Sequence, residues 1–326
     1  MKPIILLFSL WFFAGCGTGE TYVTQRDIEK DFKVDALHYE TYYFPAKKSD
    51  NAPVSYLPLK PYDLIFAGHD FNSTYALLAF ATPGKYTHTL MYLGKDSEGF
   101  AYGIEMNGDK NDSYSLDRHG LQIDGRLYVY CLGNDFGTKE CPQDLYHNGL
   151  ETYDYKWAKT LTPPLYENLM KHQKELIHTI KEDLTHSYPT QLPFHIGWDT
   201  LLTKKIPLVD DGRKNGADCT AYFVSLFEEV GKVCLEDVRM TAAELEDYYL
   251  YDPIGEQAKI PAQYNIFSKD EDLYLSTLFN EMGYLLTDTS RETQCPTHQI
   301  VSGVPVPQRL FESPDLIEIT PAEKPL

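Results

Sequence analysis

The segment 216–223, Gly-Ala-Asp-Cys-Thr-Ala-Tyr-Phe, constrains the fold of this chain most, because it places a cysteine at the start of a patterned helix. After Cys219, apolar residues recur every three or four positions, which is the spacing of one helical face. They are Phe223, Leu226, Phe227 and Val230. Asp218 suits an N-cap and Gly231 a C-terminal cap, so the helix is expected to begin at or beside Cys219. The thiol would then lie at the positive end of the helix dipole, where the pKa of a cysteine is lowered and its nucleophilic thiolate is favoured.

A second element is needed, because a cysteine in this position is equally compatible with a buried structural thiol or with half of a disulfide. Residues 86–105 provide that element. Two halves rich in aromatic and apolar residues flank a short polar segment bounded by Gly94 and Gly99. This pattern predicts a β-hairpin with a four-residue loop, 95–98.

The predicted hairpin brings a histidine and an acid together. If Gly94 and Gly99 close the loop, His88 lies directly opposite Glu105, and Leu90 lies opposite Gly103. Directly opposed residues of an antiparallel pair can hydrogen-bond through their side chains. A slip of one residue would turn Glu105 to the other face. The alternative interpretation is an exposed cross-strand ion pair.

Three segments resemble motifs of the NlpC/P60 family of cysteine peptidases. The family's Asp-Cys-Ser-Gly motif resembles residues 218–223, Asp-Cys-Thr-Ala-Tyr-Phe. Its histidine strand, Ser-His-Val-Gly-Ile-Tyr-Leu-Gly, resembles residues 87–94, Thr-His-Thr-Leu-Met-Tyr-Leu-Gly. A Gly-Asp-Leu-Ile-Phe strand opens the permuted domains and resembles residues 62–66, Tyr-Asp-Leu-Ile-Phe. Tyr62 replaces the first glycine, a departure that we expect to affect a turn rather than the chemistry.

The order of the motifs points to one branch of the family. In ordinary members the cysteine helix precedes the histidine strand, whereas here His88 and Glu105 precede Cys219. This order resembles the circularly permuted branch, the YiiX/YebB-like proteins and their relatives among the lecithin:retinol acyltransferases. The resemblance covers about residues 58–235. It implies an α+β, papain-like NlpC/P60 fold, circularly permuted, in which a cysteine helix packs on an antiparallel sheet.

The resemblance also implies the roles of three residues. Cys219 would be the nucleophile, His88 the general base and acid, and Glu105 the group that orients the imidazole. Backbone N–H groups at the start of the cysteine helix would meet the oxyanion. The third residue of ordinary members is often His, Asn or Gln, so Glu105 fits the permuted branch better. The only histidine after Cys219, His298, lies outside any strand-like pattern and is a poor candidate for the base. No cofactor is expected.

The N-terminus predicts an envelope location. Lys2 precedes an apolar run of residues 4–13, which has the length of a signal-peptide core and is too short to span a bilayer. Residues 13–16, Phe-Ala-Gly-Cys, resemble a bacterial lipobox, so Cys16 is expected to carry the lipid. Gly17 in place of Asp favours, by resemblance to Gram-negative lipoproteins, the outer membrane facing the periplasm.

Charge and cysteine content narrow the partners. A formal net charge of −19 argues against nucleic acid or anionic lipid bound through a basic surface, so membrane contact is expected through the lipid. Four cysteines without an assigned role would allow three pairings in an oxidising compartment. They are Cys131, Cys141, Cys234 and Cys295. A bond between Cys131 and Cys141 would leave Cys234 with Cys295. No zinc-binding sequence motif is present, and we expect no metal.

The chain is expected to divide into a lipoprotein signal peptide, a tether with an N-terminal extension, a catalytic domain with an insertion, and a C-terminal extension. Their ranges are 1–16, 17–57, 58–250 and 251–326. Patterning predicts a strand over 126–132, an amphipathic helix over 164–185 and a short helix over 240–250. Frequent prolines predict an extended tail over 296–326.

The sequence thus predicts a lipid-anchored thiol hydrolase that cleaves amide bonds in a peptide substrate, with cell-wall muropeptides as the expected target. This substrate follows from the family and the compartment, because no residue identifies a sugar or a diamino acid. A second hypothesis is a lipid-directed acyl hydrolase or acyltransferase, which would need an apolar channel leading to Cys219. A third is a noncatalytic binding lipoprotein, against which the intact cysteine, histidine and acid argue.

Overall fold

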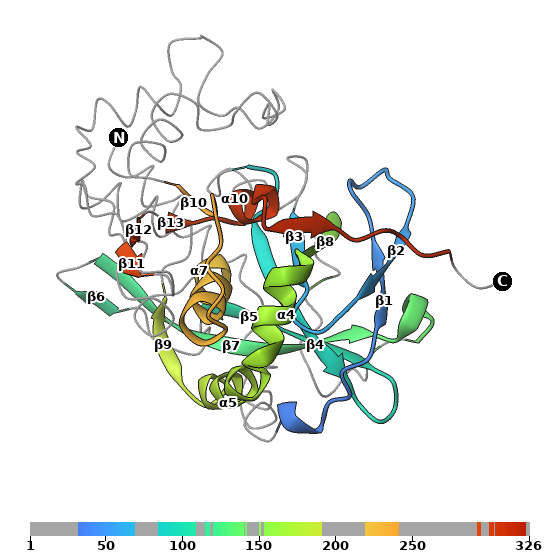
Figure 1. Ribbon diagram of the computed structural model, residues 1–326, viewed down its shortest axis with the longest axis horizontal. Helices are drawn as coiled ribbons and strands as arrows, with labels where there is room; N and C mark the ends of the chain where they lie inside the picture. The colour runs from blue at the N-terminus through green and yellow to red at the C-terminus, as the bar shows by residue number, and fades with distance from the viewer. Residues whose placement is uncertain are drawn as a thin grey trace, which may run out of the picture.

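An antiparallel β-sheet organises the chain, and helices pack against it in a mixed α+β arrangement (Figure 1). The computed structural model describes residues 32–68, 84–108, 115–117, 120–139, 141, 150, 153–190, 219–240, 292–294, 300–302 and 304–323. The strands of the sheet, in spatial order, are β14 (Leu316–Glu318), β8 (Tyr155–Leu161), β3 (Leu64–Gly68), β4 (His88–Lys95), β5 (Ala101–Gly108), β7 (Gly120–Gly133) and β6 (Ser115–Asp117). An eighth strand, β9 (Ser187–Thr190), also pairs with β7.

Three smaller strand pairs and several helices complete the described architecture. The pairs are β1 (Tyr42–Ala46) with β2 (Ser55–Leu59), β10 (Arg239–Met240) with β13 (Val304–Pro305), and β11 (Glu292–Gln294) with β12 (Ile300–Ser302). The helices are η1 (Val34–Ala36), η2 (Asp135–Gly137), α4 (Pro163–Lys171), α5 (Gln173–Asp183), α7 (Cys219–Ser225), η5 (Leu226–Val230) and α10 (Pro307–Glu312). No helix among the described residues is long and apolar enough to cross a bilayer.

The centre of the sheet is buried on both faces. Every residue of β3 and of β4 is shielded from solvent. β3 is a continuous apolar run, the pattern of a strand that is covered on both sides, and β4 is apolar from Leu90 to Leu93. Figure 1 shows α7 in front of β5 and β7, with α4 and α5 beside it. The histidine strand is therefore an interior element of the molecule.

The turn before β3 contains Tyr62, the residue that stands where the resembled motif has glycine. Tyr62 has φ +72°, a left-handed conformation that glycine adopts without strain and a bulky residue does not. Its backbone N–H donates to the carbonyl of Tyr92 (2.7 Å), and its ring is buried. The next residue, Asp63, accepts from the backbone N–H of Lys60 (2.7 Å), and burial raises the pKa of this carboxyl to about 7. As expected, the departure at position 62 falls in a turn.

Helix α7 is buried all round, rather than on the single face expected from its spacing. Every residue of α7 is buried, and the chain continues without a break into the π-helical turn η5. Tyr222 donates to Asp183 of α5 (2.8 Å), and Glu228 of η5 accepts from Arg239 of β10 (2.5 Å). Polar side chains on this helix thus have buried partners, which lets it lie inside the molecule.

Gly231 ends this helix, as expected, but through close packing rather than a left-handed backbone. Its φ is −72°, and the positive φ falls on Lys232 instead. A Cβ at position 231 would lie 2.2 Å from Cδ1 of Leu169 and 2.9 Å from the carbonyl of Phe227. A methyl group at position 231 would therefore displace the side chain of Leu169 on α4.

The helix expected over 164–185 is two helices. The break falls at His172, which ends α4 and precedes α5 with φ −104° and ψ 17°. The apolar positions of both pieces still face the core, since Leu169, Leu176 and Ile180 are fully buried. The periodicity therefore identified the buried face correctly and missed the bend.

The extended tail expected over 296–326 is wrong for its described part. Residues 307–312 form α10, and residues 316–318 form β14, which pairs with β8 at the edge of the sheet. The ring of Phe311 packs edge-on against Phe66 (5.2 Å between centroids), and its carbonyl accepts from Lys159 Nζ (2.6 Å). Pro307 occupies the first turn of α10, where proline is tolerated. Segments from both ends of the described chain, including Phe32 and Ile319, belong to the core around the sheet.

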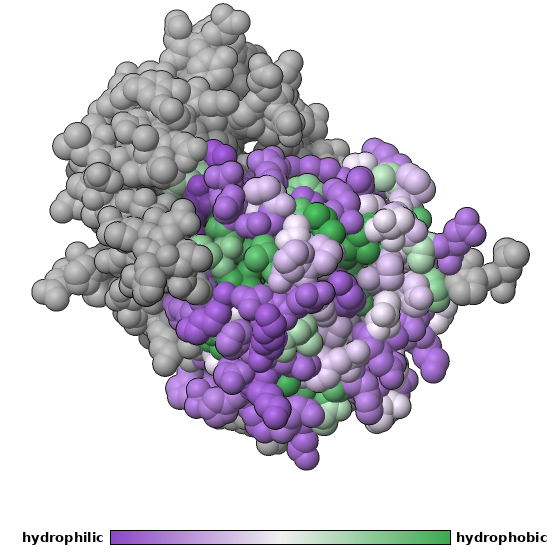
Figure 2. Space-filling model, in the orientation of Figure 1, coloured by the Kyte–Doolittle hydropathy of each residue, from purple (hydrophilic) through white to green (hydrophobic). Residues whose placement is uncertain are grey.

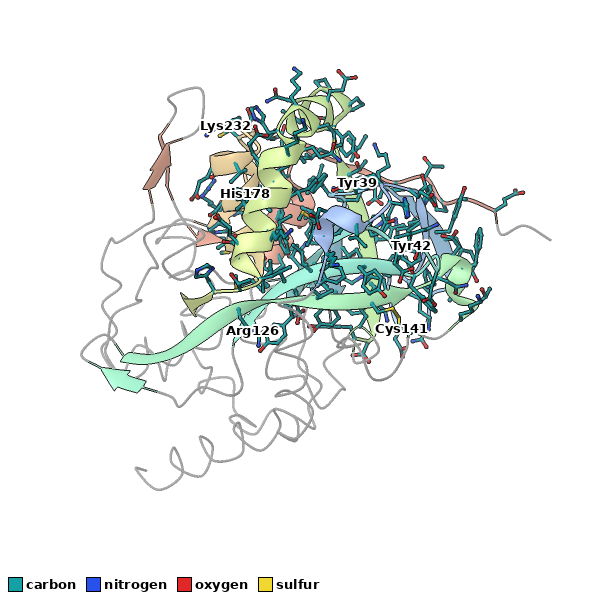
Figure 3. All side chains as sticks on the ribbon, turned by 90° about the horizontal axis from the view of Figure 1, so that it is seen from below. Tyr39, Tyr42, Arg126, Cys141, His178 and Lys232 are labelled. Atoms are coloured by element: carbon teal, nitrogen blue, oxygen red, sulfur yellow. A yellow bond between two sulfur atoms is a disulfide. The ribbon has the colours of Figure 1, made fainter. Side chains whose placement is uncertain are left out.

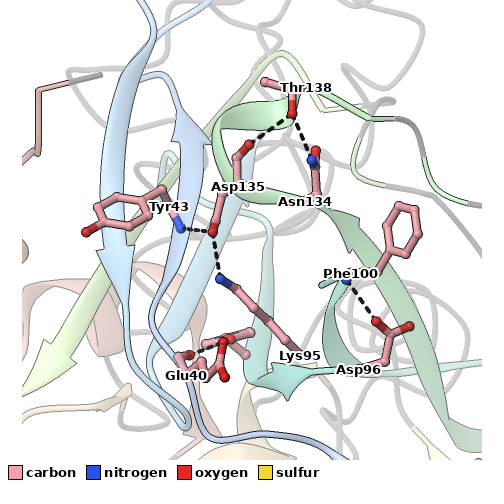
Figure 4. Close-up of polar contacts among 9 residues, drawn as sticks. Glu40, Tyr43, Lys95, Asp96, Phe100, Asn134, Asp135 and Thr138 are labelled. Atoms are coloured by element: carbon pink, nitrogen blue, oxygen red, sulfur yellow. Dashed lines mark hydrogen bonds and ion pairs between the residues drawn. The ribbon is translucent and has the colours of Figure 1, made fainter. Parts of the chain in front are cut away.

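The loop end of the β4–β5 hairpin is fixed to β1 and η2 (Figure 4). Lys95 Nζ lies 2.7 Å from Asp135 Oδ2, and Asp135 Oδ1 accepts from the backbone N–H of Tyr43 (3.0 Å). A disulfide joins Cys131 to Cys141 around this segment, and Figure 3 shows Cys141 near the C-terminal end of β7. On the face viewed in Figure 2, hydrophilic residues surround a smaller central area of hydrophobic ones.

Candidate active site

Cys219 is the first residue of α7, where the sequence predicted the start of a helix. Its side chain is buried, and it is the free cysteine of the described residues. The expected N-cap, Asp218, lies outside the described residues. The neighbouring residue Thr220 forms a hydrogen bond with Thr89 of β4 through the two hydroxyl groups (3.1 Å). Cys219 Sγ lies 3.8 Å from Thr220 Oγ1. The start of the cysteine helix is therefore attached directly to the histidine strand.

His88 and Glu105 form a buried ion pair, as the hairpin predicted. His88 Nε2 is hydrogen-bonded to Glu105 Oε2, and both side chains are almost completely shielded, so the alternative of an exposed pair is wrong. The predicted register is also wrong, because Gly103 pairs with Tyr92 and not with Leu90. The loop spans residues 96–100 rather than 95–98, and a bulge interrupts the pairing. The observed register differs from the predicted one by two residues. Because side chains alternate between the two faces of a strand, this shift leaves His88 and Glu105 on the same face, and their contact still forms.

The strands β4 and β5 are not paired where the site lies. Their ladder runs from Lys95 and Ala101 to Met91 and Ile104 and, among the described residues, stops there. His88 is instead paired with Ala67 of β3, while β5 continues along β7. Helix α7 contacts both β4 and β5. The end of the ladder thus leaves the start of α7 beside the imidazole.

The imidazole of His88 has partners on several sides. The Cys219 side chain lies close enough to raise the pKa of the ring. Nε2 of the ring is engaged by Glu105. The ring also stacks on Tyr153, at 5.7 Å between centroids and an interplanar angle of 9°. These contacts fix the plane of the imidazole between an acid and a thiol.

The charge balance at His88 favours the imidazolium. Burial of the ring lowers its pKa, and it is the largest single influence. The Glu105 carboxylate and the Cys219 sulfur act in the opposite direction, through charge and hydrogen bonding. Together they hold the pKa of His88 well above its usual range. The surroundings of His88 therefore favour a protonated ring, in spite of its burial.

Tyr130 also belongs to the cluster around His88, and the sequence motifs did not indicate it. The hydroxyl of Tyr130, on β7, donates to Glu105 Oε1, the carboxylate oxygen that does not contact His88. A strand over 126–132 was expected, but nothing in the sequence gave its register against the hairpin. Tyr130 pairs with Gly103, which places it diagonally across from Glu105.

Arg126, farther along β7 in Figure 3, is also buried and stacks over Tyr128 (5.0 Å).

Two of the expected disulfide cysteines are joined. Cys131 and Cys141 form the predicted bond, and Cys234 is also disulfide-bonded. Cys295 and the expected lipidation site Cys16 lie outside the described residues, so the pairing of Cys234 with Cys295 stays a prediction. Among the described residues, no group of three histidine, cysteine, aspartate or glutamate side chains could hold a metal ion.

Comparison with known proteins identifies no relative of this chain. No protein-family model, no curated protein sequence and no solved structure matches this chain.

Proposed function

We propose that this protein is a cysteine hydrolase of the circularly permuted NlpC/P60 type, similar to the YiiX/YebB-like proteins. One observation carries the proposal: the buried imidazole of His88 lies between a carboxylate, Glu105, and a free thiol, Cys219, at the start of a helix. Nucleophile, base and orienting acid in this order are the arrangement that thiol catalysis requires. The three sequence motifs and their permuted order support the family.

In the proposed reaction, the Cys219 thiolate attacks the carbonyl carbon of an amide, and a C–S bond forms. The His88 imidazolium gives its proton to the leaving nitrogen as the C–N bond breaks. Water then attacks the resulting thioester while His88 takes a proton from it, and the C–S bond breaks to release a carboxylic acid. Transfer of that proton to the thiolate, or its retention on His88, returns the enzyme to its starting state. Backbone N–H groups at the start of α7 would stabilise the oxyanion of both tetrahedral states.

The proposed substrate is a peptide amide of the cell wall. The support is the family resemblance together with the signal peptide and lipobox predicted for residues 1–16, which would anchor the protein through Cys16 in the outer membrane, facing the periplasm. A net charge of −19 suits a periplasmic protein whose membrane contact is the lipid rather than a basic surface.

The test is to incubate the purified protein with muropeptides and, in parallel, with phospholipids and acyl esters, and to identify products by mass spectrometry. We expect Cys219→Ala and His88→Ala to lower the rate by at least about 10²–10⁴-fold, and Glu105→Ala to lower it less. His178→Ala is the matched control, because His178 lies on α5 with a side chain that is 73% exposed. Cleavage of acyl esters but not of muropeptides would replace the amide substrate, and turnover by Cys219→Ala would contradict thiol catalysis.

A further inference from the structure

Tyr130 holds the acid of the site from the side opposite the histidine. Its hydroxyl donates to Glu105 Oε1, while Glu105 Oε2 is bonded to His88 Nε2. All three side chains are buried, and Glu105 is only 1% exposed. Each oxygen of the carboxylate therefore has a donor of its own inside the protein.

The sheet fixes the geometry of this arrangement. Tyr128 is paired with Glu105, and Tyr130 with Gly103, so Tyr130 lies diagonally across from the acid on the same face. Glu105 in turn reaches His88, which lies on β4 on its other side. Three strands, β4, β5 and β7, thus contribute one residue each to a row of polar side chains that ends at Cys219.

A carboxylate with one donor can rotate about its terminal torsion, because that torsion is broad and roughly two-fold. A second donor on the other oxygen removes this freedom. Hydrogen bonds to a charged acceptor are the stronger kind, and a buried carboxylate that loses one becomes easier to protonate. Both effects act in one direction: without the Tyr130 hydroxyl, Glu105 would be a less well oriented and less fully charged partner for the imidazole.

We propose that Tyr130 is a positioning residue of this site, which acts through Glu105 to hold the imidazole of His88 in its orientation toward Cys219. The inference rests on the proposed roles of His88, Glu105 and Cys219. It adds a fourth residue that the resemblance did not supply.

The experiment is Tyr130→Phe in the full-length protein, with two readouts that need no substrate. The first is the titration of His88 followed by NMR, and the second is the rate at which iodoacetamide alkylates Cys219. We expect His88 to titrate about one pH unit lower and alkylation at pH 7 to slow by about tenfold, the loss of one charge-assisted hydrogen bond. With a substrate in hand, kcat should fall and KM should not.

The control is Tyr222→Phe. It removes a buried tyrosine hydroxyl that also donates to a carboxylate, Asp183, and it lies on the same helix as Cys219. A loss of stability alone would affect both variants, whereas only Tyr130→Phe should shift the His88 titration. An unchanged or raised titration in Tyr130→Phe would overturn the proposal. If muropeptides are not cleaved but both readouts shift as expected, the proposed substrate fails and the role of Tyr130 stands.

Discussion

At the scale of single residues, a buried histidine carries a charge because its neighbours outweigh its burial. Burial alone would keep the His88 ring neutral, and Glu105 and Cys219 reverse this preference. The folded pKa is above the value of about 6.5 for an unfolded chain. The stability that this charge contributes is thus fully present below about pH 6.5 and is lost as the pH rises through the folded pKa.

We therefore predict that His88 remains protonated at pH 7.5, as NMR titration of labelled imidazole would show. Cys219→Ala should lower its titration point, and Glu105→Gln should lower it more, because the charge of Glu105 is the stronger opposing influence. In the double variant burial is unopposed, so His88 should titrate below about 6.5. Identical titration in all four proteins would show that neither neighbour controls the charge.

The residues of the site were predictable to different degrees. Cys219, His88 and Glu105 could be found because each lies in a segment whose own pattern defines a helix or a hairpin. Their contact was predicted from a register that is wrong by two residues, and it survived because side chains alternate with a period of two. Tyr130 could not be predicted, because it contacts Glu105 only through the pairing of β7 with β5, and no local sequence pattern indicates that register.

At the scale of elements, the helix that carries Cys219 is defined by what surrounds it. Its spacing suggested one apolar face, yet α7 and most of η5 are enclosed on every side. Sequence periodicity cannot show whether the polar side chains of a helix, here Tyr222 and Glu228, meet solvent or buried partners. It also missed the break at His172, where no proline or glycine marks the end of α4.

Gly231 gives a test of how this helix is held. Gly231→Ala requires no unfavourable φ, so its cost should come from the contact of the new methyl group with Leu169. We predict a loss of about 1–3 kcal/mol in the free energy of unfolding, measured by chemical denaturation. In a Leu169→Ala background, which removes the obstructing atoms, the same substitution should cost clearly less. Equal costs in both backgrounds would mean that the Phe227 carbonyl, and not Leu169, sets the limit.

At the scale of the whole molecule, the sheet is completed by a segment far away in sequence. The prolines of residues 296–326 suggested a tail, because proline interrupts regular structure. In the structure, Pro307 begins α10, Pro314 lies just before β14, and β14 forms the edge of the sheet beside β8. A strand of three residues is too short to show an alternating pattern, so its pairing with a distant strand could not be predicted from the sequence.

The two faces of β14 provide a matched pair for testing this assignment. Leu316 and Ile317 are adjacent apolar residues of one strand, but Leu316 is 3% exposed and Ile317 is 41% exposed. If β14 belongs to the core, Leu316→Asp places a carboxylate among apolar side chains and should lower the free energy of unfolding by more than about 3 kcal/mol. Ile317→Asp adds the same charge one residue away and should change it by less than about 1 kcal/mol. Thermal or urea unfolding of the two variants decides the point, because an extended tail would make them equally harmless, whereas an edge strand makes only the first one destabilising.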